Sequence, residues 1–343
     1  MNSPLATLNT QWRLIARPAG EVGREHFQVT RPPLPEPGLG EVRVRNLYLL
    51  IPPSMRLWMN EKETYFPPQP LGEVMAGITL GVVESSQDPS LVPGDYVNGL
   101  GGCQEWFVAP AAQLQKISPR PGVPLAAYRS VLDVQGLTAW CGLTEIGRPQ
   151  AGETLVVTAA AGSVGSLVCQ IGKRLGLRVI GIAGGAEKCA WLRDECGVDG
   201  VIDYRHDDVA ARLDALCPEG IDIVYENVGG PVMDMLIERL RFKGRVVLCG
   251  LVSSYNGGVT QNTGSLMTLV NKAARMEGFL VSEYLHRYQE VVGTLQEWVA
   301  DGSLKYQIEV LEGLDSVVDA IGRVFRGQNR GVQLVKISDE GQR

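Results

Sequence analysis

The sequence contains few of the side chains that bind transition metals. Its three histidines, His26, His206 and His286, lie far apart in polar or loop-like surroundings, and none is typical of a ligand or a general base. Its seven cysteines include no CxxC pair, which argues against a thiolate zinc site. Because the cysteines are scattered and odd in number, we expect reduced, buried thiols in a cytoplasmic protein, and no bound metal.

Long apolar runs and basic clusters are also missing. No segment approaches the length that spans a bilayer, and the first ten residues lack the basic start and apolar core of a secretory signal. The formal net charge of −6 argues against a surface for nucleic acid. We therefore expect a cytoplasmic protein that binds neither membranes nor nucleic acids, in a chain long enough for two domains.

The most informative segment is residues 153–165, which read ETLVVTAAAGSVG. The apolar run at 154–159 predicts a strand buried on both faces. Gly162 leaves room for phosphate oxygens near the backbone, Gly165 lets the next helix pack against the strand, and the helix N-terminus offers free N–H groups. With a second apolar strand at 178–183, the segment predicts a βαβ unit whose dinucleotide-binding turn has Ala160 in place of the first glycine.

The end of the second strand bears on which dinucleotide binds. An NAD site usually has an acidic residue there for the ribose 2′-hydroxyl, but this strand ends Ala183-Gly184-Gly185. Small residues leave space for a 2′-phosphate, and Lys188 can neutralise it, so the sequence favours NADP. The alternative is that Lys188 is a surface lysine whose charge is offset by Glu187.

Two regions of different character divide the chain. Residues 1–130 are rich in proline and glycine and contain short strand-like runs, which predicts a β-barrel-like domain. Further along, strands predicted at 154–159, 178–183, 200–203, 221–226, 244–249 and 275–279 alternate with helices such as 231–240, which is typical of a doubly wound parallel sheet. The tail at 308–337 is expected to form a strand, a helix and a strand that complete the first domain.

Several runs resemble one branch of a known superfamily. They are GLTA at 136–139, AAAGSVG at 159–165, QIGK at 170–173, AGGAEK at 183–188, ENVGG at 226–230, CGLVSSYN at 249–256 and GQNRG at 327–331. With these runs the chain resembles the medium-chain dehydrogenase/reductase superfamily, and more closely its zinc-free branch of prostaglandin reductases and alkenal double-bond reductases.

The resemblance implies an α/β fold: a GroES-like β-barrel domain at 1–133 with 308–343, and a doubly wound parallel-sheet Rossmann domain for NADP at 134–307. It implies NADPH as cofactor and a small enone or alkenal as substrate, whose conjugated C=C bond receives hydride at the β-carbon and a proton at the α-carbon. Zinc-dependent members carry a Gly-His-Glu run, whereas residues 71–77 here read LGEVMAG. A homodimer is a possibility that relatives suggest.

The resemblance also assigns residues to the cofactor. The diphosphate is expected at Gly162, Ser163, Val164 and Gly165, the 2′-phosphate at Gly184, Lys188 and Tyr204, and the nicotinamide half at Thr138, Asn227, Cys249, Gly250, Ser254, Tyr255, Phe279, Val281 and Asn329. The alternatives are that Tyr204 is a packing aromatic and that Asn227 and Asn329 cap loops.

Tyr255 is the candidate catalytic residue. Hydride addition to an enone places negative charge on the carbonyl oxygen, and a proton must then reach the α-carbon. With no metal and no suitable histidine, a phenol, a ribose hydroxyl or water remains as donor. Tyr255 follows the fifth strand of the predicted sheet, and its hydroxyl can donate a hydrogen bond or a proton. The alternative is that Tyr255 only packs against the nicotinamide ribose.

The sequence departs from the branch where the substrate is expected. The usual Tyr-Leu-Ser-x-Asp-Pro-Tyr-Met-Arg is replaced at 48–56 by YLLIPPSMR, a glutamine replaces the proline of Met-Pro-Gly, and a cysteine stands where an aromatic is expected. These changes predict either an unusual substrate, bulkier or more polar than simple alkenals, or drift in a weakly selected pocket. The predicted pocket residues are Tyr48, Ser54, Met55, Arg56, Cys103 and Gln135.

Two other interpretations stay open at this point. A quinone reductase would share the cofactor site but pass hydride to a flat ring. An NADPH-binding protein with little turnover would keep the cofactor site and lose the substrate site.

Overall fold

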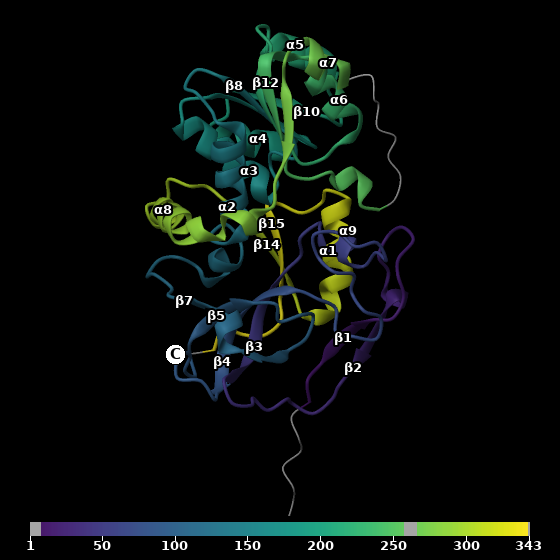
Figure 1. The fold of residues 1–343 in the computed structure, drawn as a ribbon, viewed down its shortest axis with the longest axis vertical. Helices are drawn as coiled ribbons and strands as arrows, with labels where there is room; N and C mark the ends of the chain where they lie inside the picture. The colour runs from purple at the N-terminus through teal and green to yellow at the C-terminus, as the bar shows by residue number, and fades with distance from the viewer. Residues whose placement is uncertain (1–7, 257–265, 342–343) are drawn as a thin grey trace, which may run out of the picture. The chain divides into compact units, whose positions relative to one another are not determined.

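The computed structural model describes residues 8–256 and 266–341. The chain divides into two compact units. Unit 1 contains Met1–Arg129, Ile308–Asn329 and Gln333–Arg343, and unit 2 contains Ser130–Gln307 and Arg330–Val332. In Figure 1, the strands of unit 1 are purple and blue, and the C-terminal elements that join them are yellow.

An antiparallel sheet around the long strand β3 (Glu41–Leu50) forms most of unit 1. β3 pairs antiparallel with β4 (Ile78–Ser86), with β6 (Trp106–Pro110) and with β15 (Val332–Lys336). The sheet order is β14-β15-β3-β4-β5-β7, with β6 beside β3, so the C-terminal tail enters the sheet formed by the start of the chain. The remaining strands are β5 (Tyr96–Gly99), β7 (Gln115–Ile117), β14 (Ile308–Glu312) and the separate pair β1 (Gln11–Leu14) and β2 (Phe27–Thr30).

Large apolar side chains from distant parts of the sequence fill the main core of unit 1. Trp12 of β1, Met55 of α1 (Met55–Trp58) and Val317 of α9 (Val317–Phe325) are completely buried in one cluster. α9 presents one apolar face to this cluster because its apolar residues recur at helical spacing. The strand, helix and strand predicted for the tail are therefore present.

Unit 2 contains a six-stranded parallel sheet in the order β10-β9-β8-β11-β12-β13. The order reverses between β8 and β11, and the carboxyl ends of strands at such a reversal are where sheets of this kind bind their ligands. The strands are β8 (Thr154–Val157), β9 (Arg178–Ala183), β10 (Gly200–Asp203), β11 (Ile221–Glu226), β12 (Leu240–Leu248) and β13 (Arg275–Gly278). The predicted fold class is confirmed.

Helices cover both faces of this sheet because most of its strands are apolar on both sides. On one face, Gly172 of α3 (Ser163–Arg174) lies against Leu155 and Val179. On the other face, Val156 and Val224 belong to a core that includes residues of α5 and α6. The other helices are α2 (Val134–Cys141), continued by a π-helix at Gly142–Gly147, α4 (Ala186–Asp194), α5 (Val209–Leu216), α6 (Gly230–Glu238), α7 (Leu266–Asn271) and α8 (Tyr288–Ala300).

Some predicted boundaries were wrong. The strand predicted over 154–159 ends at Val157, because Ala159 adopts a left-handed conformation with φ of 46° that turns the chain out of the sheet. The strand predicted from residue 244 begins at Leu240, and the helix predicted at 231–240 ends at Glu238.

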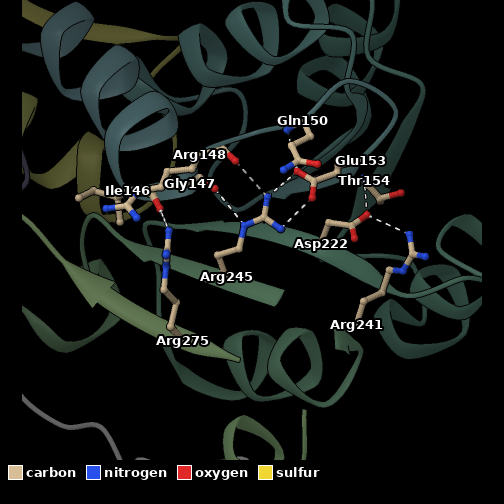
Figure 2. A network of polar contacts seen from close by, with 10 residues as sticks. All are labelled: Ile146, Gly147, Arg148, Gln150, Glu153, Thr154, Asp222, Arg241, Arg245 and Arg275. Atoms are coloured by element: carbon tan, nitrogen blue, oxygen red, sulfur yellow. Dashed lines mark hydrogen bonds and ion pairs between the residues drawn. The ribbon is translucent and has the colours of Figure 1, made fainter. Parts of the chain in front are cut away.

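Arginine side chains hold the amino end of the parallel sheet (Figure 2). Arg245 of β12 forms an ion pair with Glu153, which directly precedes β8, and donates to the carbonyl of Gly147 at 3.0 Å. Arg275 of β13 donates to the carbonyl of Ile146 at 2.5 Å. Both cations therefore stabilise the carbonyl end of the helix that α2 begins, where positive charge is favourable.

Replacement of Gly165 by alanine is expected to destabilise the turn after β8. A Cβ at this position would lie 2.4 Å from the carbonyl oxygen of Ala159, so we expect the Gly165→Ala variant to lose roughly 1–3 kcal/mol of unfolding free energy in urea. The matched control is Gly293→Ala in α8, where a Cβ meets nothing within 4 Å and alanine should stabilise by up to about 1 kcal/mol. Equal stability of the two variants would contradict the close packing of α3.

Candidate functional site

The turn between β8 and α3 presents several hydrogen-bond donors at the carboxyl end of β8. Gly162 precedes α3 with extended backbone, and the N–H of Ser166 makes the first helical bond to its carbonyl. The N–H groups of residues 163–165 therefore lie at the open end of the helix, where a phosphate binds favourably. Among the described residues, the buried hydroxyl of Ser163 has no hydrogen-bond partner. The residues present fit a diphosphate, because this hydroxyl needs a partner and the start of a helix favours an anion.

Small residues at the tip of β9 make room for an aromatic ring from the tip of β10. A Cβ at Gly184 would lie 2.7 Å from the ring of Tyr204, whose side chain is 48% exposed. Gly185 has φ of 98° and donates its N–H to Asp203 at 2.8 Å. The carboxylate near this tip therefore already accepts a hydrogen bond from the protein backbone. Tyr204 packs against the strand tip, and its predicted contact with a 2′-phosphate stays a prediction.

Two basic side chains lie near the same tip. Lys188 is half-buried in the first turn of α4, and the guanidinium of Arg205 lies 5.8 Å from the centre of the Tyr204 ring. Glu187 forms an ion pair with Arg330 at 2.6 Å. Arg205 was not among the predicted site residues; the available signal was a basic residue directly after Tyr204.

Asn227 lies where the sheet order reverses, directly after β11. Its side-chain amide donates to the carbonyl of Thr158 at 2.7 Å, and its own N–H bonds the hydroxyl of Thr158 at 2.8 Å. These bonds join the ends of β8 and β11. Thr158 and the adjoining Glu226 were not predicted as site residues; the signal for Glu226 was an acidic residue at the end of an apolar strand.

The loop after β12 folds back on itself around Tyr255. The N–H groups of Cys249 and Gly250 both bond the carbonyl of Glu226, at 2.9 and 3.1 Å, and this fixes the start of the loop beside β11. The hydroxyl of Tyr255 accepts the N–H of Leu251 at 3.4 Å. The loop thus fixes the phenol among the strand ends. The hydroxyl of Ser254 donates to the carbonyl of Leu251 at 2.7 Å, so it serves as a cap.

The other residues predicted for the nicotinamide half occupy different positions. Thr138 donates its hydroxyl to Val134 within α2, and its carbonyl accepts the phenol of Tyr225 at 2.9 Å. Phe279 follows β13 and packs against Gly142, where a Cβ would lie 2.6 Å from the ring. The half-buried Val281 begins a short 3-10 helix, and Asn329 belongs to unit 1; their predicted contacts stay predictions.

The predicted pocket residues of unit 1 are mostly packing residues. Met55 and Cys103 have no exposed surface and belong to the main core of this unit, so they offer no atom to a ligand in this conformation. Arg56 donates to the carbonyls of Pro18 and Gly20, at 2.8 and 3.2 Å. That these three residues line a substrate pocket stays a prediction.

The remaining pocket candidates keep polar groups that a ligand can reach or replace. Tyr48 is buried and donates its hydroxyl to Glu340 at 2.8 Å; burial and this carboxylate raise the pKa of the phenol. Ser54 is half-buried. Gln135, near the start of α2, is 7% exposed, and its side-chain oxygen has no protein partner.

The cysteines are free, and six of the seven are buried. Burial raises the pKa of Cys103 to about 12. The exception is Cys249, which is half-buried, and loss of solvation raises its pKa to about 11. Because thiolates rather than thiols are nucleophiles, these side chains are unreactive at neutral pH.

Within residues 8–256 and 266–341, no three His, Cys, Asp or Glu side chains gather in a way that could hold a metal ion. No helix in the same ranges is long and apolar enough to cross a membrane.

The chain matches two protein families along its length. The family described as N-terminal domain of oxidoreductase matches residues 10–117, and the family described as zinc-binding dehydrogenase matches residues 163–297. The crystal structure of CurA from Vibrio vulnificus in complex with NADPH superposes with a TM-score of 0.91 at 37% identity and covers 96% of this chain and 99% of that one.

Two curated relatives are similar over most of the chain. The NADPH-dependent curcumin reductase of Escherichia coli (strain K12) is 38% identical over 338 residues, which cover 97% of this chain and 98% of that protein. The 2-alkenal reductase (NADP(+)-dependent) of Nicotiana tabacum is 38% identical over 306 residues, or 88% and 89% of the two chains.

The fold, the strand-end site and these likenesses define a medium-chain dehydrogenase/reductase. Within that superfamily, the chain belongs to the zinc-independent branch of alkenal and enone reductases. The resemblance in the sequence is thereby confirmed.

Proposed function

We propose that this protein reduces the C=C bond of α,β-unsaturated ketones and aldehydes with NADPH. The observation that carries the proposal is the 38% identity, over nearly the whole chain, to reductases named for curcumin and for 2-alkenals. Curcumin and 2-alkenals share a C=C bond conjugated with a carbonyl. The geometry of unit 2 supports the proposal, because the start of α3 and the hydroxyl of Ser163 lie at the carboxyl end of a strand where the sheet order reverses.

The proposed cofactor site extends along these strand ends. Gly162, Ser163, Val164 and Gly165 would hold the diphosphate, and Lys188 and Tyr204 would hold the 2′-phosphate beside Gly184. Asn227, Thr138 and the loop from Cys249 to Tyr255 would hold the nicotinamide half, with Phe279, Val281 and Asn329. When bound, NADPH supplies the hydride; the side chains supply position and charge.

The protein must then stabilise the oxygen that gains negative charge. Hydride addition at the β-carbon makes an enolate, whose oxygen needs a hydrogen-bond donor and whose α-carbon needs a proton. We assign this role to the phenol of Tyr255, which the N–H of Leu251 orients within the loop after β12. The cysteines are poor alternatives because an S–H group is only a weak hydrogen-bond donor, and six of the seven are buried.

The Tyr255→Phe variant tests this role. With NADPH saturating, its turnover of an enone should fall on the order of a hundredfold, while its Kd for NADPH stays within threefold. Tyr65→Phe is the matched control, because Tyr65 is an exposed tyrosine of unit 1. Unchanged turnover in Tyr255→Phe would remove the donor role.

The wild-type enzyme should oxidise NADPH with an enone and release the saturated ketone, identified by mass. Hydroquinone from a quinone, with no product from the enone, would instead make it a quinone reductase. Tight NADPH binding without turnover of either would contradict an enzymatic role.

The Lys188→Ala variant tests the choice of cofactor. Because the ammonium group would neutralise the 2′-phosphate, we expect the Kd for NADPH to rise about tenfold or more and the Kd for NADH to change little. Lys272→Ala, an exposed lysine after α7, should leave both constants unchanged. Equal weakening of NADPH and NADH would show that Lys188 does not read the phosphate.

We further propose that the protein is cytoplasmic and forms a homodimer through the edge of the parallel sheet. The free cysteines support a reducing compartment.

The proposed dimer interface is the edge of the parallel sheet at β13. This strand ends the sheet order, and such an edge leaves backbone groups for another strand. The helical segments before and after β13 in the sequence carry exposed apolar residues, among them Val270 at 70% and Leu285 at 54%. Light scattering should give the mass of two chains; the mass of one chain would contradict the dimer.

A further inference from the structure

A buried carboxylate stands at the point where the sheet order reverses. Glu226 is the last residue of β11, and its side chain has no exposed surface. One carboxylate oxygen accepts the Thr158 hydroxyl at 3.0 Å, the Val228 N–H at 2.6 Å and the Gly229 N–H at 2.7 Å. The other oxygen has no protein partner. No ion pair of the described residues includes Glu226, so neutral donors alone offset its burial.

These contacts fix the direction of the hydroxyl of Thr158. A hydroxyl has one proton, and the Glu226 oxygen that accepts the N–H groups of Val228 and Gly229 is an acceptor. The Thr158 proton therefore points to this oxygen at 3.0 Å rather than to the Tyr225 carbonyl at 3.5 Å, and the hydroxyl oxygen accepts the N–H of Asn227 at 2.8 Å. Burial raises the pKa of Glu226, and the hydrogen bonds from Gly229, Val228 and Thr158 oppose this shift.

A further contact, with the backbone carbonyl of Thr158, fixes the side-chain amide of Asn227. The carbonyl of Thr158 can only accept, so the group that faces it at 2.7 Å must be the NH2 of Asn227. The amide oxygen must then face away from Thr158. The side chain is half-buried, and its oxygen stands at the carboxyl edge of the sheet as a hydrogen-bond acceptor.

We propose that Glu226 and Thr158 are positioning residues that aim the amide oxygen of Asn227 at a neutral donor of the nicotinamide half of the cofactor. This inference rests on the proposed function. The acceptor suits a ribose hydroxyl or a carboxamide N–H, and a buried carboxylate beside it disfavours an anion. Glu226 and Thr158 do not touch the cofactor; their effect passes through Asn227.

A double-mutant cycle tests this relay through the Kd of NADP+, measured by titration calorimetry. The Thr158→Val variant keeps the shape and removes the hydroxyl, and Asn227→Ala removes the amide. Each substitution should raise the Kd of NADP+ about tenfold. Because both act at one acceptor, the double variant should bind about as weakly as Asn227→Ala alone. Additive effects, about a hundredfold together, or an unchanged Kd in Thr158→Val would overturn the inference.

Controls separate positioning from folding. Thr158→Ser keeps the hydroxyl and should bind like wild type. Thr294→Val removes a hydroxyl that only bonds the carbonyl of Glu290 in α8, and it should not change the Kd. Adenosine 2′,5′-bisphosphate lacks the nicotinamide half, so all variants should bind it equally. If Thr158→Val does not fold, Glu226→Met, which removes the acceptor of the Thr158 hydroxyl, replaces it in the cycle with the same expected coupling to Asn227.

The same measurements distinguish failure of the proposed function from failure of the positioning role of Glu226 and Thr158. Wild-type protein that binds neither NADP+ nor adenosine 2′,5′-bisphosphate would contradict the proposed function and the inference with it. Wild-type protein that binds both, with additive effects in the cycle, would contradict the inference alone.

Discussion

The pairing of β8 with β11 is the constraint on which the rest of unit 2 depends. These two strands lie side by side in a parallel sheet, yet the chain continues from them to opposite edges of that sheet. Their carboxyl ends must therefore separate into two turns, one leading into α3 and one into α6. Each turn leads to the N–H groups at the start of a helix. The hydrogen bonds between Thr158, Glu226 and Asn227 hold the two turns in place relative to each other.

The two ends of the parallel sheet are built in different ways. At the amino end, charged side chains close the structure, since Arg245 pairs with Glu153 and Arg275 caps a helix. At the carboxyl end, glycines and short polar residues surround the buried hydroxyl of Ser163, which has no partner in the part of the chain that the structure describes. Polar groups that stay unpaired in a folded protein cost stability unless a ligand satisfies them. The carboxyl end is thus the end that benefits from a bound nucleotide.

The parts of this fold that local pattern determines could be predicted from the sequence. The apolar strand, the glycines at 162 and 165 and the helical spacing that follows act over a dozen neighbouring residues, so the βαβ unit was visible without a structure. The small tip at Gly184 was also visible. The packing of Tyr204 on this tip was harder to predict from the sequence, because the contact depends on the pairing of β9 with β10.

Contacts between distant residues explain what the sequence did not reveal. Glu226 and Thr158 are 68 residues apart, and only the register of β8 with β11 brings them together. Met55 and Cys103 were predicted to line a pocket because they lie at or beside positions where the sequence departs from the pattern of its family branch. Their burial among apolar side chains of the tail and of β1 depends on how these segments pack in unit 1.

Transfer of deuterium from the reduced cofactor to an enone tests the central claim most directly. If hydride goes to the β-carbon, NADPH carrying deuterium at the transferred position of C4 should give a saturated ketone with deuterium at the β-carbon and none at the carbonyl carbon. Nuclear magnetic resonance of the product distinguishes these positions. Deuterium at the carbonyl carbon, in an allylic alcohol, would show carbonyl reduction and would contradict the account.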